Sequence, residues 1–281
     1  RYRWFERLPA IISWSLLLLP LILSIWYPWP VSVVLLIYTL FWLYRSIGMT
    51  TRLVMGYRQY RRAIKQDWLA YCQALLPDRN WSKLHHAVII AVSNEAEPIV
   101  AATLEALTLS QYPADRVMVV LAVEARGGDE VAAAMQRLSE LYSSRFKKVL
   151  VVIHPADRTG EVRGKGANIT FAGRELLTFV RQQKLDPANV IVTTLDADNR
   201  VHPKYLANLA YAFAMDPDPL HSSYQPLPMF FNNIWDVPLA IRSISVGSSF
   251  WHLTESISPD RLRNFSAHAQ SLAALIATDF W

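Results

Sequence analysis

Two long apolar segments open the chain. No charged residue lies between Arg7 and Arg45, a stretch that is too long for one membrane-spanning helix and suits two. We place the two helices at residues 9–27 and 31–48, because a bilayer core requires ~20 residues for each crossing. Residues 27–30 combine two prolines with two aromatic side chains, which predicts a tight turn at the membrane interface.

Basic residues flank this pair of segments on both sides. Arg1, Arg3 and Arg7 precede the first segment. A larger cluster follows the second segment and consists of Arg45, Arg52, Arg58, Arg61, Arg62 and Lys65. By the positive-inside rule both ends of the pair face the cytoplasm, and we expect the remaining ~230 residues there. A signal peptide and a buried helical hairpin are the competing interpretations, and the immediate second apolar segment disfavours a signal peptide.

Beyond residue 85, short apolar runs alternate with segments of helical periodicity. The apolar runs cover residues 86–92, 117–123, 149–153 and 190–195, and continuous runs of this kind are typical of parallel strands buried on both faces. Helical patterns begin near Pro98 and cover residues 129–144, 167–184 and 203–214. The alternation predicts an α/β domain with a mostly parallel, doubly wound sheet. We expect a two-helix transmembrane anchor at 1–48, a basic juxtamembrane linker at 49–85 and the α/β domain at 86–281.

Residues 216–264 have a different character. Prolines interrupt them, and aromatic side chains mix with small polar ones. This composition suits a surface that faces a substrate or the membrane, and an amphipathic helix packed under the sheet is the alternative. Residues 265–270 fit a short strand, and residues 271–277 fit the start of a helix.

Composition narrows the classes of partner. The 281-residue chain is 52% hydrophobic, which is high for a soluble domain and low for a bundle of many spans, and its formal charge is +5. Basic chains bind nucleic acid, anionic lipid or phosphorylated ligands. Because the basic cluster follows an apolar segment directly, we assign it to the membrane surface and expect no nucleic-acid partner. The single cysteine, Cys72, excludes an intrachain disulfide and fits a packing residue.

Paired acids follow the fourth apolar run. Asp196 and Asp198 stand two residues apart at its end, so their side chains point the same way if the strand continues. Two aligned carboxylates at the carboxyl end of a parallel strand suit a hard divalent cation, and that cation suits a diphosphate. A helix-capping turn is the structural alternative.

Three further polar elements are expected at the same edge of the sheet, where open α/β sheets bind ligands. They are the turn Ser93-Asn94-Glu95, then Glu124, and the glycine-containing loop that carries Arg163, Lys165 and Asn168. The two basic side chains and the amides at the start of the following helix would hold an anion. A solvated Lys165 and an exposed ion pair between Glu124 and Arg126 are the alternatives.

Three stretches together resemble the membrane-anchored family 2 glycosyltransferases of the GT-A fold. They cover residues 88–95, 164–168 and 196–199, and the likeness extends over about residues 86–277. The resemblance implies inverting transfer of a sugar from a UDP- or GDP-sugar, with Mg²⁺ or Mn²⁺, to a glycan or lipid-linked acceptor in polysaccharide biosynthesis. It implies that Ser93, Asn94, Glu95 and Asn168 lie beside the nucleotide, Lys165 near the diphosphate, Asp196 near the ribose or sugar, and Asp198 on the metal.

The sequence departs from the pattern of that family in two places. Glu124 stands where most members carry an aspartate that reads the uracil or ribose, which leaves the nucleotide preference open. The family places its catalytic base shortly after the segment that matches residues 265–277, and this chain stops at Trp281. We expect the base beyond the chain, with Asp279 as a second candidate. A Gln-x-x-Arg-Trp motif and carboxyl-terminal membrane helices are absent from the 281 residues.

Candidate acceptor residues lie in the proline-interrupted segment and shortly after it. They are Asn232, Asn233, Trp235, Trp251 and His268. The histidines show no zinc spacing such as H-E-x-x-H. Two rival functions remain: a nucleotidyltransferase-type enzyme that uses the same aspartates, and an inactive donor-binding or scaffold subunit.

Overall fold

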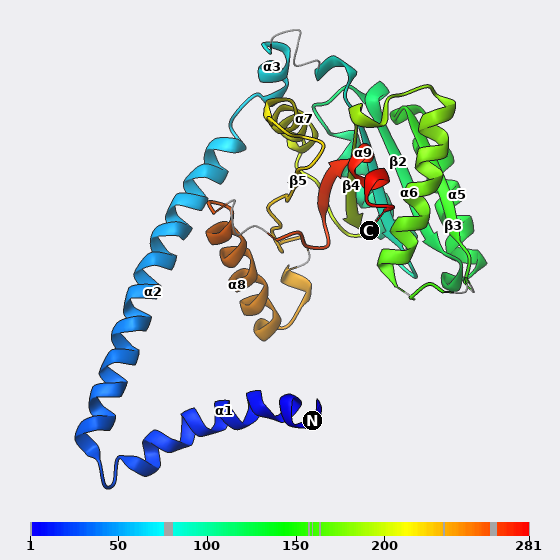
Figure 1. Cartoon of the computed structure of the whole chain (residues 1–281). Helices are drawn as coiled ribbons and strands as arrows, with labels where there is room; N and C mark the ends of the chain where they lie inside the picture. Colours follow the sequence, from blue (N-terminus) through cyan, green and yellow to red (C-terminus); the bar gives the residue numbers. More distant parts are fainter. Residues whose placement is uncertain are drawn as a thin grey trace.

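Two long helices lead into an α/β domain (Figure 1). The computed structural model describes residues 2–75, 81–156, 158, 160–162, 164–232, 234–258 and 263–280. The helices are α1 (Tyr2–Leu23), α2 (Pro28–Ala63), α3 (Trp68–Gln73), α4 (Glu97–Thr108), α5 (Asp129–Tyr142), α6 (Lys165–Gln182), α7 (Tyr205–Met215), α8 (Leu239–Glu255) and α9 (Leu272–Ala277). The strands are β1 (His85–Val92), β2 (Val117–Glu124), β3 (Lys148–His154), β4 (Val190–Asp196), β5 (Ser223–Tyr224) and β6 (His268–Ser271).

The described strands form one six-stranded sheet in the order β3-β2-β1-β4-β6-β5. The first four strands in this order are parallel, with Val88 of β1 opposite Val119 of β2 and Thr193 of β4. Strand β6 runs antiparallel to β4, and β5 runs antiparallel to β6. The predicted fold class, a mostly parallel α/β sheet preceded by two long apolar helices, is confirmed.

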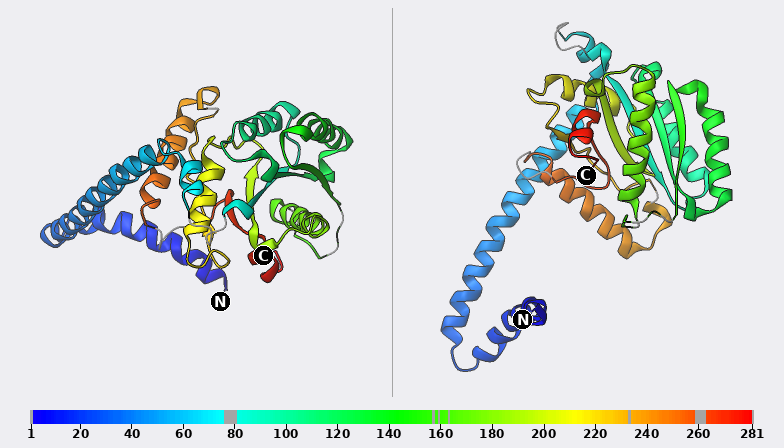
Figure 2. Two further views of the ribbon diagram at one scale, coloured as in Figure 1. Left: turned by 90° about the horizontal axis from the view of Figure 1, so that it is seen from above. Right: turned by 45° about the vertical axis from the view of Figure 1, so that its right-hand side comes forward.

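Both faces of the sheet are buried. In β1, Val88 and Ile90 point into a core shared with α4, α5 and α7, whereas Ala87 and Ile89 point into a second core shared with α6 and α9. Helices therefore cover the sheet on both sides (Figure 2). This double burial explains why the strands are continuous apolar runs instead of alternating ones.

The second long helix extends further than the sequence pattern suggested. Both α1 and α2 are long and apolar enough to cross a membrane. The prediction ended the second helix at residue 48, but α2 continues to Ala63. The extension contains Arg, Met, Leu and Gln, which favour helix, and Arg61 and Arg62 in its last turn complement the negative end of the helix dipole.

The proline-interrupted segment contains helix α8, which packs against α2 and not under the sheet (Figure 1). The alternative prediction, an amphipathic helix packed under the sheet, is therefore wrong: the helix exists, but it packs against α2. Gly56 permits the close approach, because a Cβ at this position would lie 2.0 Å from the carbonyl oxygen of Leu253. Any residue with a Cβ at position 56 would displace the backbone of α8.

We expect Gly56→Ala to loosen the contact between α2 and α8 by about 1–3 kcal/mol, because the added methyl group meets backbone that cannot rotate away. Gly48→Ala is the matched control on the same helix, since a Cβ there meets no heavy atom within 4 Å. Both changes raise helix propensity equally. Limited proteolysis of the detergent-solubilised chain over a temperature series measures the difference. Equal protection of the two variants would contradict the prediction.

Candidate functional site

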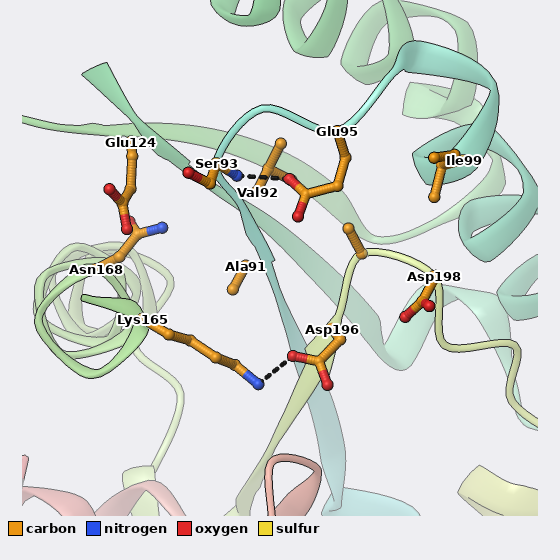
Figure 3. Close-up of a pocket in the computed structure, with 11 residues that line it drawn as sticks. Ala91, Val92, Ser93, Glu95, Ile99, Glu124, Lys165, Asn168, Asp196 and Asp198 are labelled. Carbon is orange, nitrogen blue, oxygen red and sulfur yellow. Dashed lines mark hydrogen bonds and ion pairs between the residues drawn. The ribbon is translucent and has the colours of Figure 1, made fainter. Parts of the chain in front are cut away.

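A cavity of about 440 Å³ lies at the carboxyl ends of β1, β2 and β4 (Figure 3). Its described lining consists of Ala91, Val92, Ser93, Glu95, Ile99, Glu124, Lys165, Asn168, Asp196, Ala197 and Asp198. The structure thus brings together residues from all four polar elements that the sequence analysis placed at this edge. Asn94 is not part of this lining, and Arg163 and Asn233 lie outside the described residues.

Lys165 and Asp196 face each other across the cavity (Figure 3). Lys165 opens α6 and Asp196 closes β4, and the Lys165 Nζ donates to Asp196 Oδ1. Ser266 completes the cluster: its Oγ donates to Asp196 Oδ2 at 2.5 Å, and its carbonyl oxygen accepts from Lys165 Nζ at 3.2 Å. Burial acts to raise the pKa of Asp196, but the hydrogen bonds from Lys165 and Ser266 outweigh it and hold that pKa below its usual value. Asp196 is therefore an ionised, positioned carboxylate.

The side chain of Glu95 bonds to the backbone of the turn that follows β1, to which Glu95 itself belongs. Glu95 Oε2 accepts from the backbone amide of Ser93 at 2.6 Å and from that of Asn94 at 3.1 Å. The turn also packs on the 3₁₀ turn η4 (Ala125–Gly127), where a Cβ on Gly127 would lie 1.9 Å from the Ser93 carbonyl oxygen. Amides that already bind a carboxylate are suited to binding another anion, but a phosphate would first have to displace Glu95.

Glu124 and Asn168 line the cavity on the side opposite Asp198 (Figure 3). Glu124 has a side chain only 12% exposed and pairs with Arg126 at 3.2 Å, so the expected ion pair exists but is not fully exposed. Asn168 Nδ2 donates to the carbonyl oxygen of Ala122 at 2.7 Å. Its buried Oδ1 has no hydrogen-bond partner among the described residues. That oxygen is an acceptor next to the cavity and suits a ligand hydroxyl or amino group.

Among the described acids that line the cavity, Asp198 is the one whose carboxylate makes no hydrogen bond or ion pair, so it could bind a cation. It lines the cavity beside Asp196, and its carbonyl oxygen accepts from Asn232 Nδ2 at 2.8 Å. Within the described part of the chain, no group of three His, Cys, Asp or Glu side chains could hold a metal ion alone. A hard cation here fits only with Asp198, or both aspartates, supplying part of its oxygen ligands and a bound diphosphate supplying others.

The remaining candidates lie away from this cavity. Trp235 is 79% exposed and stacks under Arg242, whose Cζ is 5.2 Å from the ring centre. Trp251 lines a second cavity, between α8 and α2. His268 lies on β6 opposite Thr194, with its Nδ1 3.1 Å from the Phe265 carbonyl oxygen. Asp279 has a side chain 80% exposed and pairs with Arg174 at 3.4 Å.

Comparisons with known proteins find similar structures but no similar sequences. No protein-family model matches the chain, and no curated protein matches it. A mannosyltransferase from Pyrobaculum calidifontis, solved in complex with GDP-Man and Mn²⁺, has 16% identity over 83% of this chain and 56% of its own, with a TM-score of 0.44. S. aureus TarS has 14% identity over 70% of this chain and 30% of its own, with a TM-score of 0.38. Mouse xyloside xylosyltransferase 1 has 13% identity over 68% of each chain, with a TM-score of 0.32.

The chain spans about half the length of that mannosyltransferase and less than a third of that TarS chain. Similarity at this level identifies no substrate.

The sequence pattern did not predict Ser266 as a partner of Lys165 and Asp196. The signal lies in the register of β6 against β4: Thr194 pairs with His268 in an antiparallel ladder, so the position two residues before His268 falls opposite Asp196. This pairing joins segments about 70 residues apart in the chain, and the local pattern around Ser266 does not specify it.

Proposed function

We propose that the chain is a membrane-anchored, inverting family 2 glycosyltransferase that uses a UDP- or GDP-sugar and Mg²⁺ or Mn²⁺. One observation carries the proposal. Lys165, Asp196 and Asp198 converge on one cavity at the carboxyl edge of the parallel strands, which is the edge where open α/β sheets bind ligands. The order of the three sequence motifs, together resembling that family, supports the same reaction class.

In this proposal each part of the cavity has one task. Asp198 would hold the divalent cation, which would supply positive charge to neutralise the diphosphate leaving group. Lys165 binds the diphosphate after exchanging its contact with Asp196 for one with phosphate oxygens, and Asp196 then orients the sugar or ribose. Ser93, Glu95, Glu124 and Asn168 surround the nucleoside.

The transfer step needs an acceptor and a base. An acceptor hydroxyl oxygen attacks the anomeric carbon, the bond from that carbon to the diphosphate oxygen breaks, and the nucleoside diphosphate leaves with the electron pair. A base takes the hydroxyl proton, and Asp279 is the candidate among the described residues. Asn232 is an acceptor-side candidate that contacts a residue of the cavity, because its Nδ2 donates to the Asp198 carbonyl oxygen.

Membrane attachment is part of the proposal. The length and apolar character of α1 and α2 support it, and the basic residues on both sides of the pair support a cytoplasmic domain. A cytoplasmic site has access to nucleotide-activated sugars, which fits a glycan or a lipid-linked molecule as the acceptor in polysaccharide biosynthesis.

Calorimetric titration of the detergent-solubilised chain with UDP- and GDP-sugars, with and without Mn²⁺, tests this function. We expect one nucleotide sugar to bind only with Mn²⁺, and Asp198→Ala to weaken binding by about 100-fold through loss of a cation ligand. Asp115→Ala is the control, since Asp115 is an exposed acid outside the cavity. Binding of a nucleoside triphosphate in place of any nucleotide sugar would favour the nucleotidyltransferase. Metal-independent binding that survives Asp198→Ala would overturn the proposed metal role.

A further inference from the structure

A second and larger cavity, of about 860 Å³, lies where α2 meets α8. Its walls come from α2, from α8, from residues 225–228 and from the residues just before β6. The first cavity, which is the proposed binding site of the nucleotide sugar and is called the donor cavity below, shares none of these lining residues. The two cavities are nevertheless neighbours along the chain, because Phe265 lines the second one and the adjacent Ser266 contacts Lys165 and Asp196.

The second cavity is strongly basic. Arg45, Arg52 and Arg263 line it, and Glu255 is the acid among its described lining residues. Arg45 and Arg52 are seven residues apart on α2, so they lie on one face of the helix. Among the residues that the structure describes, none of the three arginines forms an ion pair with a carboxylate. Three guanidinium groups that have no carboxylate partner among the described residues, around one cavity, suit a phosphate-bearing ligand.

The same cavity has an apolar side. Trp251 and Phe265 are both about half exposed within it, and Met49 and Leu227 extend the apolar wall. A free phosphate ion would gain nothing from these aromatic and aliphatic surfaces. An amphiphile matches both sides, with its anionic head group at the arginines and its first hydrocarbon groups against Trp251 and Phe265.

The position along α2 indicates where such a ligand comes from. Residues 28–44 of α2 carry no charge, and Arg45 is the first charged residue after them. A bilayer core takes ~20 residues of helix, so Arg45 marks the level at which α2 leaves the hydrocarbon. Lipid head groups lie at this level, and juxtamembrane arginines attract anionic ones.

We propose that this second cavity binds the phosphate head group of an anionic membrane lipid whose chains remain in the bilayer beside α2. Arg45, Arg52 and Arg263 hold the phosphate, while Trp251 and Phe265 cover the apolar part next to it. The proposal rests on the membrane attachment proposed above, and it does not require the sugar-transfer chemistry. A bound lipid would contact the segment that carries Ser266, and so would lie beside the donor cavity.

Short-chain lipids test the proposal on the full chain in detergent. Dihexanoyl phosphatidic acid, dihexanoyl phosphatidylcholine and inorganic phosphate are titrated separately by calorimetry. We expect phosphatidic acid to bind at least about tenfold more tightly than either of the others, because it alone combines a phosphate monoester with hydrocarbon. Arg45→Gln and Arg52→Gln should each weaken that binding by about tenfold. Arg58→Gln, an exposed arginine on the same helix that does not line the cavity, should leave it unchanged.

Arg45→Lys and Trp251→Ala extend the test if a glutamine variant fails to fold. We expect Arg45→Lys to keep most of the affinity and Trp251→Ala to weaken phosphatidic acid binding while leaving phosphate binding unchanged. Equal affinity of the Arg45→Gln and Arg58→Gln chains would overturn the proposal, as would phosphate or phosphatidylcholine binding as tightly as phosphatidic acid. Titration of the same samples with nucleotide sugar keeps the two proposals separate: Asp198→Ala should lose the nucleotide sugar and retain the lipid.

Discussion

Replacing Lys165 with methionine is expected to lower kcat/KM for sugar transfer by about 10²–10³-fold, the loss typical when one positioned charge that stabilises a developing anion is removed. Methionine preserves the length and the apolar stem of the side chain but removes the ammonium group that bonds to Asp196 and Ser266. In the proposed reaction the leaving diphosphate would then lack one of its two neutralising charges, the other being the cation proposed at Asp198. Steady-state kinetics with the nucleotide sugar identified by calorimetry measures the change.

Three variants separate the roles within the Lys165 cluster. Lys148→Met changes an exposed lysine on β3 that does not line the cavity, and it should leave kcat/KM unchanged. Ser266→Ala removes one hydroxyl but leaves the ion pair, so we expect a loss of about tenfold, near the net value of one hydrogen bond to a charged group. Asp196→Asn should cost more than Ser266→Ala, because it removes the charge of the pair. Full activity of Lys165→Met would contradict the assignment of Lys165 to the diphosphate.

Most of the sheet was predictable from the chain because its signals are local. The parallel strands are continuous apolar runs, and the predicted runs 117–123 and 190–195 match β2 and β4 to within one residue at each end. The convergence of Ser93, Lys165 and Asp196 was predictable for a related reason, since the carboxyl ends of parallel strands meet at one edge of a sheet. Neither inference needed knowledge of contacts between distant segments.

Two features that the sequence did not predict depend on distant partners. Helix α8 packs on α2 through Gly56 and Leu253, which are almost 200 residues apart in the chain. The hydrophobic periodicity of either helix does not indicate that the other is its partner. Ser266 joins Lys165 and Asp196 only because β6 pairs with β4 in one register. A third feature is local: the Glu95 side chain accepts hydrogen bonds from the backbone amides of its own turn. The sequence was compatible with several conformations of this side chain.

Gly127→Ala is expected to weaken nucleotide-sugar binding by at least about tenfold, which corresponds to about 1.4 kcal/mol. The added methyl group would lie 1.9 Å from the Ser93 carbonyl oxygen and 3.1 Å from its carbonyl carbon. Because both are backbone atoms, the clash is relieved only by moving the turn of residues 93–95 or η4. Either movement displaces the wall of the donor cavity formed by Ser93 and Glu95.

Gly247→Ala provides the control for this prediction. Gly247 lies in α8, outside the cavity, and a Cβ there meets no heavy atom within 4 Å. We therefore expect it to retain the wild-type affinity and to gain up to about 1 kcal/mol of helix stability. Calorimetry of both variants with the same nucleotide sugar, together with thermal unfolding, separates a displaced turn from a damaged fold. If the Gly127→Ala chain binds as tightly as the Gly247→Ala chain, the turn after β1 has no part in holding the nucleotide, and the proposed donor site would have to be built from Lys165, Asn168, Asp196 and Asp198 alone.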